Sequence, residues 1–152
     1  MIAALELHAA CDDGSPEFPF EHPARAVLFF LSMLRILAVD NEPSVITSLR
    51  FVFGPPRYHL TSVSHGEDAL AEVDQAAEPF DVIIVDQKMP HLTGTDLVAA
   101  LRQRGVTSKI IVLSAGVTDE LRQVYGGLQV HEIFEKPFDL AQLRAAVDAV
   151  ER

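Results

Sequence analysis

Four acidic, hydroxyl and amino side chains stand at the ends of apolar runs, where they could carry out phosphoryl transfer. In DVIIVDQKMP the apolar residues are followed directly by Asp86, and in ILAVDNEP they are followed directly by Asp40. Two further runs, IIVLSA and IFEKPF, bring Ser114 and Lys136 to similar places. Two carboxylates held a few ångströms apart repel each other, so they need a counter-charge or a raised pKa. Lys136 offers the counter-charge.

Oxygen ligands in this arrangement suit Mg²⁺ or Mn²⁺, since Mg²⁺ takes one or two carboxylates together with waters and phosphate oxygens. One carboxylate would attack phosphorus and form an acyl phosphate. The metal and Lys136 would neutralise the equatorial oxygens, and the hydroxyl of Ser114 would donate a hydrogen bond to one of them.

These side chains can meet only if their strands are neighbours in one sheet. From Leu34 onward, strand-like runs alternate with segments of helical spacing. We predict strands at 34–39, 58–63, 80–85, 109–114 and 130–134, and helices at 43–53, 66–77, 94–105, 118–127 and 139–151. Apolar strands between amphipathic helices predict an α/β fold, a doubly wound parallel sheet of five strands with helices on both faces. In the order 2-1-3-4-5, the ends of strands 1, 3, 4 and 5 converge on one crevice.

The fragments ILAVDNEP, DVIIVDQKMPHLTG, IIVLSA and IFEKPF, in this order and spacing, resemble the receiver domain of bacterial two-component response regulators. The resemblance covers about residues 34–152. It implies a flavodoxin-like fold and a signalling protein, not a metabolic enzyme. Such a domain takes a phosphoryl group from a sensor histidine kinase or a histidine phosphotransfer protein onto an aspartate.

The resemblance also implies a role for each site residue. Asp86 matches the phosphoacceptor, Ser114 the switch hydroxyl, and Lys136 the family's lysine that precedes a proline, here Pro137, often in a cis bond. The expected metal ligands are Asp40, Asn41, Asp86 and the backbone carbonyl of Lys88. Gly94 matches the turn after the acceptor.

Two positions depart from the family pattern. Asn41 stands where the family usually has a second acid, which predicts weaker Mg²⁺ affinity and leaves open whether Asn41 ligates the metal or only caps the following helix. Glu42 could compensate, but Pro43 after it suggests that its side chain points along the helix start. Ile133 replaces the aromatic residue that turns inward in the family, and Phe134 should face the opposite side of the strand.

Composition narrows the partners and the location. The chain has 152 residues, one cysteine (Cys11) and a formal net charge of −10, so we expect no nucleic-acid binding, no membrane span and a cytoplasmic location.

We expect residues 1–32 to be an extension upstream of a natural start at Met33. A real, poorly ordered tail, or docking of residues 26–30 on the domain, stays open. Residues 33–152 are the expected receiver domain.

The leading hypothesis is a stand-alone, chemotaxis-type receiver that switches partner binding through the face formed by residues 118–152; a homodimer stays open. The alternative is a degenerate receiver that binds proteins without phosphorylation, which Asn41 and Ile133 favour. An aspartyl phosphohydrolase is disfavoured because Lys88 stands where such enzymes need a second acid. A flavin-binding protein is disfavoured because DNEP would repel phosphate.

Overall fold

The fold is that of a computed structural model that describes residue 24 and residues 33–150. The predicted extension at residues 1–32, including Cys11, therefore lies outside the described residues apart from Ala24. Its boundary at Met33 stays a prediction.

Five parallel strands form one sheet in the order β2-β1-β3-β4-β5, as the sequence predicted. The strands are β1 (Leu34–Val39), β2 (Tyr58–Val63), β3 (Val82–Asp86), β4 (Lys109–Ser114) and β5 (Glu132–Glu135). The central strands are buried on both faces, because each face is covered by helices. β2 lies at an edge and is only half-buried beyond Tyr58.

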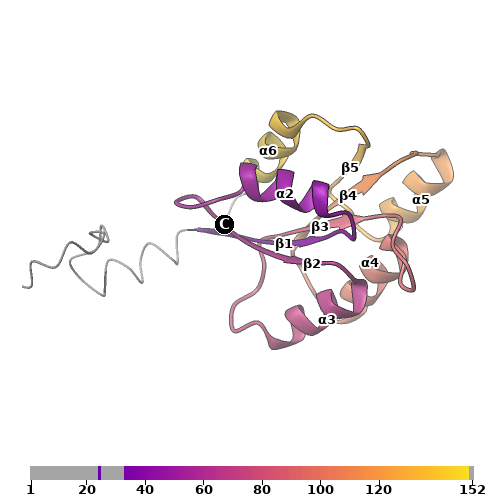
Figure 1. Cartoon of the computed structure of the whole chain (residues 1–152). Coiled ribbons are helices and arrows are strands. Elements are labelled where there is room, and N and C mark those ends of the chain that lie inside the picture. The colour runs from indigo at the N-terminus through magenta and orange to yellow at the C-terminus, as the bar shows by residue number, and fades with distance from the viewer. Residues whose placement is uncertain (1–23, 25–32, 151–152) are drawn as a thin grey trace, which may run out of the picture. The chain divides into compact units, whose positions relative to one another are not determined.

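The helices are divided between the two faces of the sheet (Figure 1). They are α2 (Pro43–Val52), α3 (Gly66–Gln75), α4 (Gly94–Gln103), α5 (Asp119–Gly127) and α6 (Leu140–Asp148). Leu49 of α2 and Leu143 of α6 pack into one core, whereas Leu97 of α4 and Tyr125 of α5 pack into the other. This doubly wound arrangement agrees with the predicted fold class.

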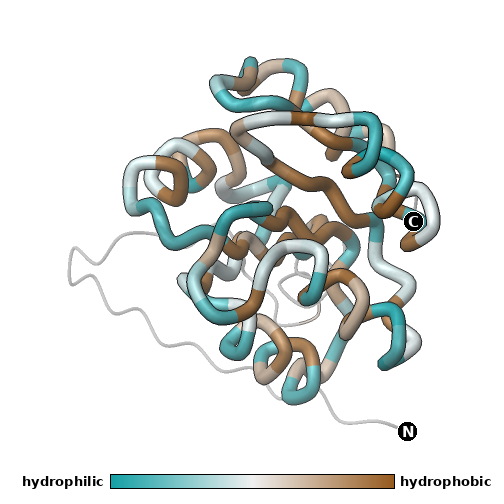
Figure 2. The backbone as a smooth tube through the Cα atoms, turned by 90° about the vertical axis from the view of Figure 1, so that its right-hand side faces the viewer, coloured by the Kyte–Doolittle hydropathy of each residue, from teal (hydrophilic) through white to brown (hydrophobic). Residues whose placement is uncertain are grey.

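Successive strand residues alternate between these two cores. Ile36 and Ala38 face α2 and α6, while Leu37 and Val39 face α3, α4 and α5. The hydrophobic segments accordingly run through the middle of the molecule in Figure 2. Burying each large aliphatic side chain contributes about 1.5–3 kcal/mol, so the sheet that carries the site is stabilised by a large apolar core.

Several boundaries differ from the sequence prediction. The third strand was expected at 80–85 but spans Val82–Asp86, and the last helix was expected at 139–151 but spans Leu140–Asp148. The last strand was expected at 130–134 but begins at Glu132, because Val130 packs on the second core from the loop before the strand. Gly126 and Gly127 lie in the last turn of α5, and the residue with a positive φ just after this helix is Gln129 (56°).

The described helices include none that is long and apolar enough to cross a membrane.

Candidate functional site

Strand register brings the predicted residues to one edge of the sheet. Val39 of β1 pairs with Val85 of β3, so the next residues, Asp40 and Asp86, lie side by side. Asp86 in turn pairs with Leu113, which places Ser114 one step further along β4. Ser114 pairs with Glu135 of β5, and Lys136 follows it directly.

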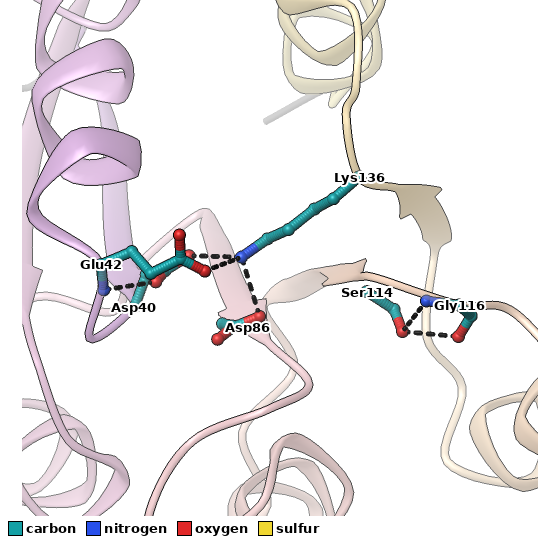
Figure 3. A network of polar contacts seen from close by, with 6 residues as sticks. All are labelled: Asp40, Glu42, Asp86, Ser114, Gly116 and Lys136. Atoms are coloured by element: carbon teal, nitrogen blue, oxygen red, sulfur yellow. Dashed lines mark hydrogen bonds and ion pairs between the residues drawn. The ribbon is translucent and has the colours of Figure 1, made fainter.

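Lys136 joins the acidic residues across this edge (Figure 3). Its Nζ lies 3.1 Å from Oδ1 of Asp86 and 3.3 Å from Oδ2 of Asp40. The two carboxylates are nearly fully buried, with side chains 3% and 2% exposed, and the lysine side chain is 17% exposed. Buried charges require partners of this kind, because an unpaired one costs several kcal/mol, on the order of 3–5. The peptide bond from Lys136 to Pro137 is cis, as the family resemblance implied.

The burial of the site shifts the pKa of two groups. Burial, and to a lesser degree the charge of Asp86, raises the pKa of Asp40, although the Glu42 amide and Lys136 oppose this. Burial is also the largest influence on Lys136 and acts to lower its pKa. Hydrogen bonds to Asp86 and Glu42, with the charges of Asp40 and Asp86, outweigh it, so the pKa of Lys136 is raised overall. Lys136 therefore stays an ammonium at neutral pH.

Glu42 is the residue that the sequence placed wrongly. Its side chain does not follow the start of α2 but turns back, with Oε1 3.1 Å from Nζ of Lys136. Its backbone amide donates to Oδ1 of Asp40 at 2.8 Å, which holds the turn between β1 and α2. The N-cap of α2 is Glu42 itself, without a side-chain cap bond, so the capping role considered for Asn41 is wrong.

Ser114 is buried at the end of β4, but its hydroxyl is engaged elsewhere. Oγ donates to the carbonyl of Gly116 at 2.7 Å, and the Gly116 amide lies 3.4 Å from the same Oγ. Figure 3 shows this pair beside the acidic cluster. The hydroxyl would have to leave Gly116 to contact a group on Asp86.

The loop after Asp86 packs tightly on the start of α4. The amide of Gln87 donates to Leu113 O at 2.8 Å, and the amide of Gly94 donates to Gln87 O at 3.0 Å. A Cβ on Gly94 would lie 2.8 Å from the carbonyl oxygen of Asp86, so this position admits only glycine without a shift. Thr93 caps α4 by accepting from the amide of Asp96. The predicted turn role of Gly94 has this physical basis.

A pocket of about 530 Å³ opens over the cluster. It is lined by Asn41, Glu42, Asp86, Lys88, Met89, Pro90, Ala115 and Lys136. Lys88 is exposed, and the role expected for its backbone carbonyl stays a prediction. His91 is an exposed loop residue with φ of 68°.

The donor set fits a hard divalent cation. One carboxylate oxygen from each of Asp40, Glu42 and Asp86 lies within 4.8 Å of the others. Within the described part of the chain, no other group of three acidic, histidine or cysteine side chains has this spacing. Oxygen ligands without imidazole or thiolate favour Mg²⁺ or Mn²⁺ over Zn²⁺.

Tyr125 is a further residue near the site, and no motif in the sequence assigned it there. Its hydroxyl lies 3.5 Å from Oγ1 of Thr95, which in turn contacts the side chain of Gln87 at 3.2–3.3 Å. Burial, with a smaller contribution from the charge of Asp86, raises the pKa of Tyr125 to about 12. The helical spacing of Leu121 and Tyr125 was the available signal that Tyr125 faces inward.

Comparison with known proteins defines the class. The response regulator receiver domain matches residues 36–148, so the chain belongs to that family. The fold and the sequence motifs agree with it.

Particular relatives come from several bacteria. The chain is 32% identical over 119 residues to the alkaline phosphatase synthesis transcriptional regulatory protein PhoP of Bacillus subtilis, covering 78% of this chain and 48% of PhoP. It is 34% identical over 121 residues to the transcriptional regulatory protein KdpE of Mycobacterium tuberculosis, covering 76% and 51%. The chain thus spans about half the length of the curated relatives it matches.

Among solved structures, the chemotaxis protein CheY4 of Vibrio cholerae matches with a TM-score of 0.71 and 28% identity. That match covers 78% of this chain and 99% of the CheY4 chain.

Proposed function

We propose that this protein accepts a phosphoryl group on Asp86 from a sensor histidine kinase or a histidine phosphotransfer protein, and that phosphorylation changes its binding to a partner protein. The observation that carries the proposal is the position of Lys136, whose ammonium contacts both buried carboxylates, Asp40 and Asp86. An ammonium in this place is a ready partner for a phosphoryl oxygen.

In the proposed reaction, a carboxylate oxygen of Asp86 attacks the phosphorus of a phosphohistidine. The new O–P bond forms as the N–P bond breaks, and the electron pair of that bond returns to the imidazole of the donor. Lys136 then donates to the transferred group. Ser114 exchanges its bond to the Gly116 carbonyl for one to the same group, which pulls the β4–α5 loop toward Asp86.

Mg²⁺, when bound, would neutralise negative charge on the phosphoryl oxygens. Asp40, Asp86 and the loop carbonyl of Lys88 are the proposed ligands from the family pattern, and Asn41 could add its amide oxygen. Each is close to the pocket over Asp86 or part of it. The protein would assist only its own phosphorylation and dephosphorylation.

The proposed output is binding to a protein, through the face from Thr118 to the end of α6. The formal charge of −10 disfavours contact with nucleic acid. The stand-alone form stays a proposal, because the match covers 99% of the CheY4 chain but only about half of PhoP and KdpE. A native polypeptide from its source cells that carries a further domain beside the receiver would overturn the stand-alone proposal.

A degenerate receiver is the second candidate, because Asn41 removes one charge from the metal site and Ile133 offers no aromatic ring for the switch. Ile133 packs on the second core and Phe134 on the first, so Phe134 does not substitute for it.

Beryllofluoride, which mimics a phosphoryl group on a carboxylate, tests the two candidates. We expect Mg²⁺-dependent ¹⁹F resonances of a bound complex for the wild type and for Asp119→Asn, an exposed acid on α5. Asp86→Asn should give none. If the wild type also gives none while it remains folded, the degenerate module is the correct interpretation.

A further inference from the structure

The three carboxylates at the site carry more charge than one lysine can balance. Asp40, Glu42 and Asp86 contribute three negative charges and Lys136 one positive charge, which leaves a formal charge of −2. A divalent cation would neutralise that remainder. Without Glu42 the remainder would be −1, so the exposed glutamate, and not Asn41, completes the charge match.

Glu42 is also the partner that can move. Its side chain is 55% exposed, whereas those of Asp40 and Asp86 are 2% and 3% exposed. Its bond to Lys136 is a surface-accessible ion pair, and such pairs contribute little to stability. Little free energy therefore opposes exchange of the ammonium for another cation.

The spacing of the oxygens permits that exchange. The three carboxylate oxygens lie within 4.8 Å of one another. Oxygens on a common octahedral Mg²⁺ at 2.0–2.1 Å stand roughly 3 Å apart in cis and roughly 4 Å apart in trans. A shift of the exposed side chain would bring Glu42 into contact with such a cation, directly or through a metal-bound water.

We propose that Glu42 replaces the missing acid at position 41 in Mg²⁺ binding, and that it leaves Lys136 when it turns to the cation. Its release would free the Lys136 ammonium for the phosphoryl group on Asp86. This inference deepens the proposed function and rests on it for the last step only. Metal binding by Glu42 stands without it.

A double-mutant cycle on Glu42 and Asn41 tests the proposal through metal affinity alone. Mg²⁺ dissociation constants are measured by calorimetry, without a phosphodonor, for the wild type, Glu42→Gln, Asn41→Asp and the double variant. We expect Glu42→Gln to weaken Mg²⁺ binding about tenfold with Asn41 present. In the Asn41→Asp background the same change should cost less than about twofold, because the carboxylate introduced at position 41 then supplies the charge.

Glu72→Gln on α3, also exposed, is the matched control for loss of one surface charge and should leave the dissociation constant unchanged within about twofold. An unchanged constant in Glu42→Gln, or an equal weakening in both backgrounds, would overturn the proposal and leave Glu42 as a partner of Lys136 only. Thermal unfolding without metal shows that each variant is folded.

The beryllofluoride experiment separates this inference from the proposed function. Adduct formation with a Glu42-independent Mg²⁺ affinity would contradict only the role of Glu42. A Glu42-dependent affinity without any adduct on Asp86 would contradict only the proposed phosphorylation.

Discussion

At the scale of single residues, the site depends on one ammonium shared among carboxylates. Lys136 contacts Asp86 and Asp40, which are almost inaccessible to water, and Glu42 at the rim. The lysine thus holds together the ends of β1, β3 and β5. Its removal would leave two buried carboxylates with no counter-charge from the protein.

We expect Lys136→Met to lower the free energy of unfolding by about 3 kcal/mol at neutral pH without Mg²⁺, because breaking a buried ion pair leaves its partner unpaired. Urea unfolding measures the change. Lys109→Met, at an exposed position at the start of β4, is the matched control and should change stability by less than about 0.5 kcal/mol. Equal stabilities of the two variants would contradict the expectation.

The raised pKa of Tyr125 implies that the folded protein loses stability in alkaline solution. Burial raises its folded-state pKa to about 12, above the unfolded value near 10. Between these values the native state holds more protons than the unfolded state. Stability is therefore unaffected below about pH 10 and falls as the pH rises toward 12, by on the order of 1 kcal/mol per pH unit at most.

Urea midpoints measured from about pH 9 to pH 12 should fall less steeply in Tyr125→Phe than in the wild type. Some loss will remain, because burial also raises the pKa of Tyr58. Identical slopes would show that Tyr125 ionises as readily in the native state as in the unfolded chain.

At the scale of elements, the loop between β3 and α4 fixes where Asp86 points. Two backbone hydrogen bonds hold it, from Gln87 to Leu113 and from Gly94 to Gln87. On the other side of α4, the guanidinium of Arg102 donates to the carbonyls of Val106, Leu128 and Gln129 and so ties α4 to the end of α5. The acceptor loop and the proposed output helix are thus both anchored on α4.

We expect Gly94→Ala to destabilise the protein by about 1–3 kcal/mol, because its Cβ would meet backbone atoms of Asp86 and Gln87 at 2.8 Å. Gly126→Ala, within α5 and with nothing within 4 Å of its Cβ, should stabilise by up to about 1 kcal/mol. Thermal unfolding of both variants measures the contrast. If Gly94→Ala is as stable as Gly126→Ala, the loop between β3 and α4 accommodates the added Cβ without loss of stability, which contradicts the expectation.

The sequence predicted most of these elements because apolar periodicity reports burial directly. The strands 34–39, 58–63 and 109–114 have the predicted bounds. The start of β5 was missed because Val130 and Ile133 are both partly buried, and a run of apolar residues does not distinguish a strand from the loop that leads to it.

Side-chain direction was less predictable than position. The order 2-1-3-4-5 places Asp40, Asp86 and Lys136 together from register alone. The orientation of Glu42 depends on an ammonium 94 residues away in sequence, and the contact of Ser114 with Gly116 depends on the conformation of the β4–α5 loop. Neither has a local signature.

At the scale of the whole molecule, the excess negative charge of Asp40, Glu42 and Asp86 over Lys136 destabilises the metal-free protein, and a bound cation would offset this charge. A ligand that binds only the native state stabilises it by RT ln(1 + [L]/Kd), about 2.7 kcal/mol at one hundred times Kd. We therefore expect Mg²⁺ to raise the Tm of the wild type, and Na⁺ at equal ionic strength to do so much less. A Tm that responds equally to both salts would indicate screening of the net charge and not a site.

The most direct test of the central claim is the mass of the protein after incubation with acetyl phosphate. We expect an increase by one phosphoryl group that requires Mg²⁺, is labile as acyl phosphates are, maps to Asp86, and persists in Asp119→Asn but not in Asp86→Asn. A folded wild-type protein that gains no phosphoryl group, or gains it in Asp86→Asn as readily, would contradict the account.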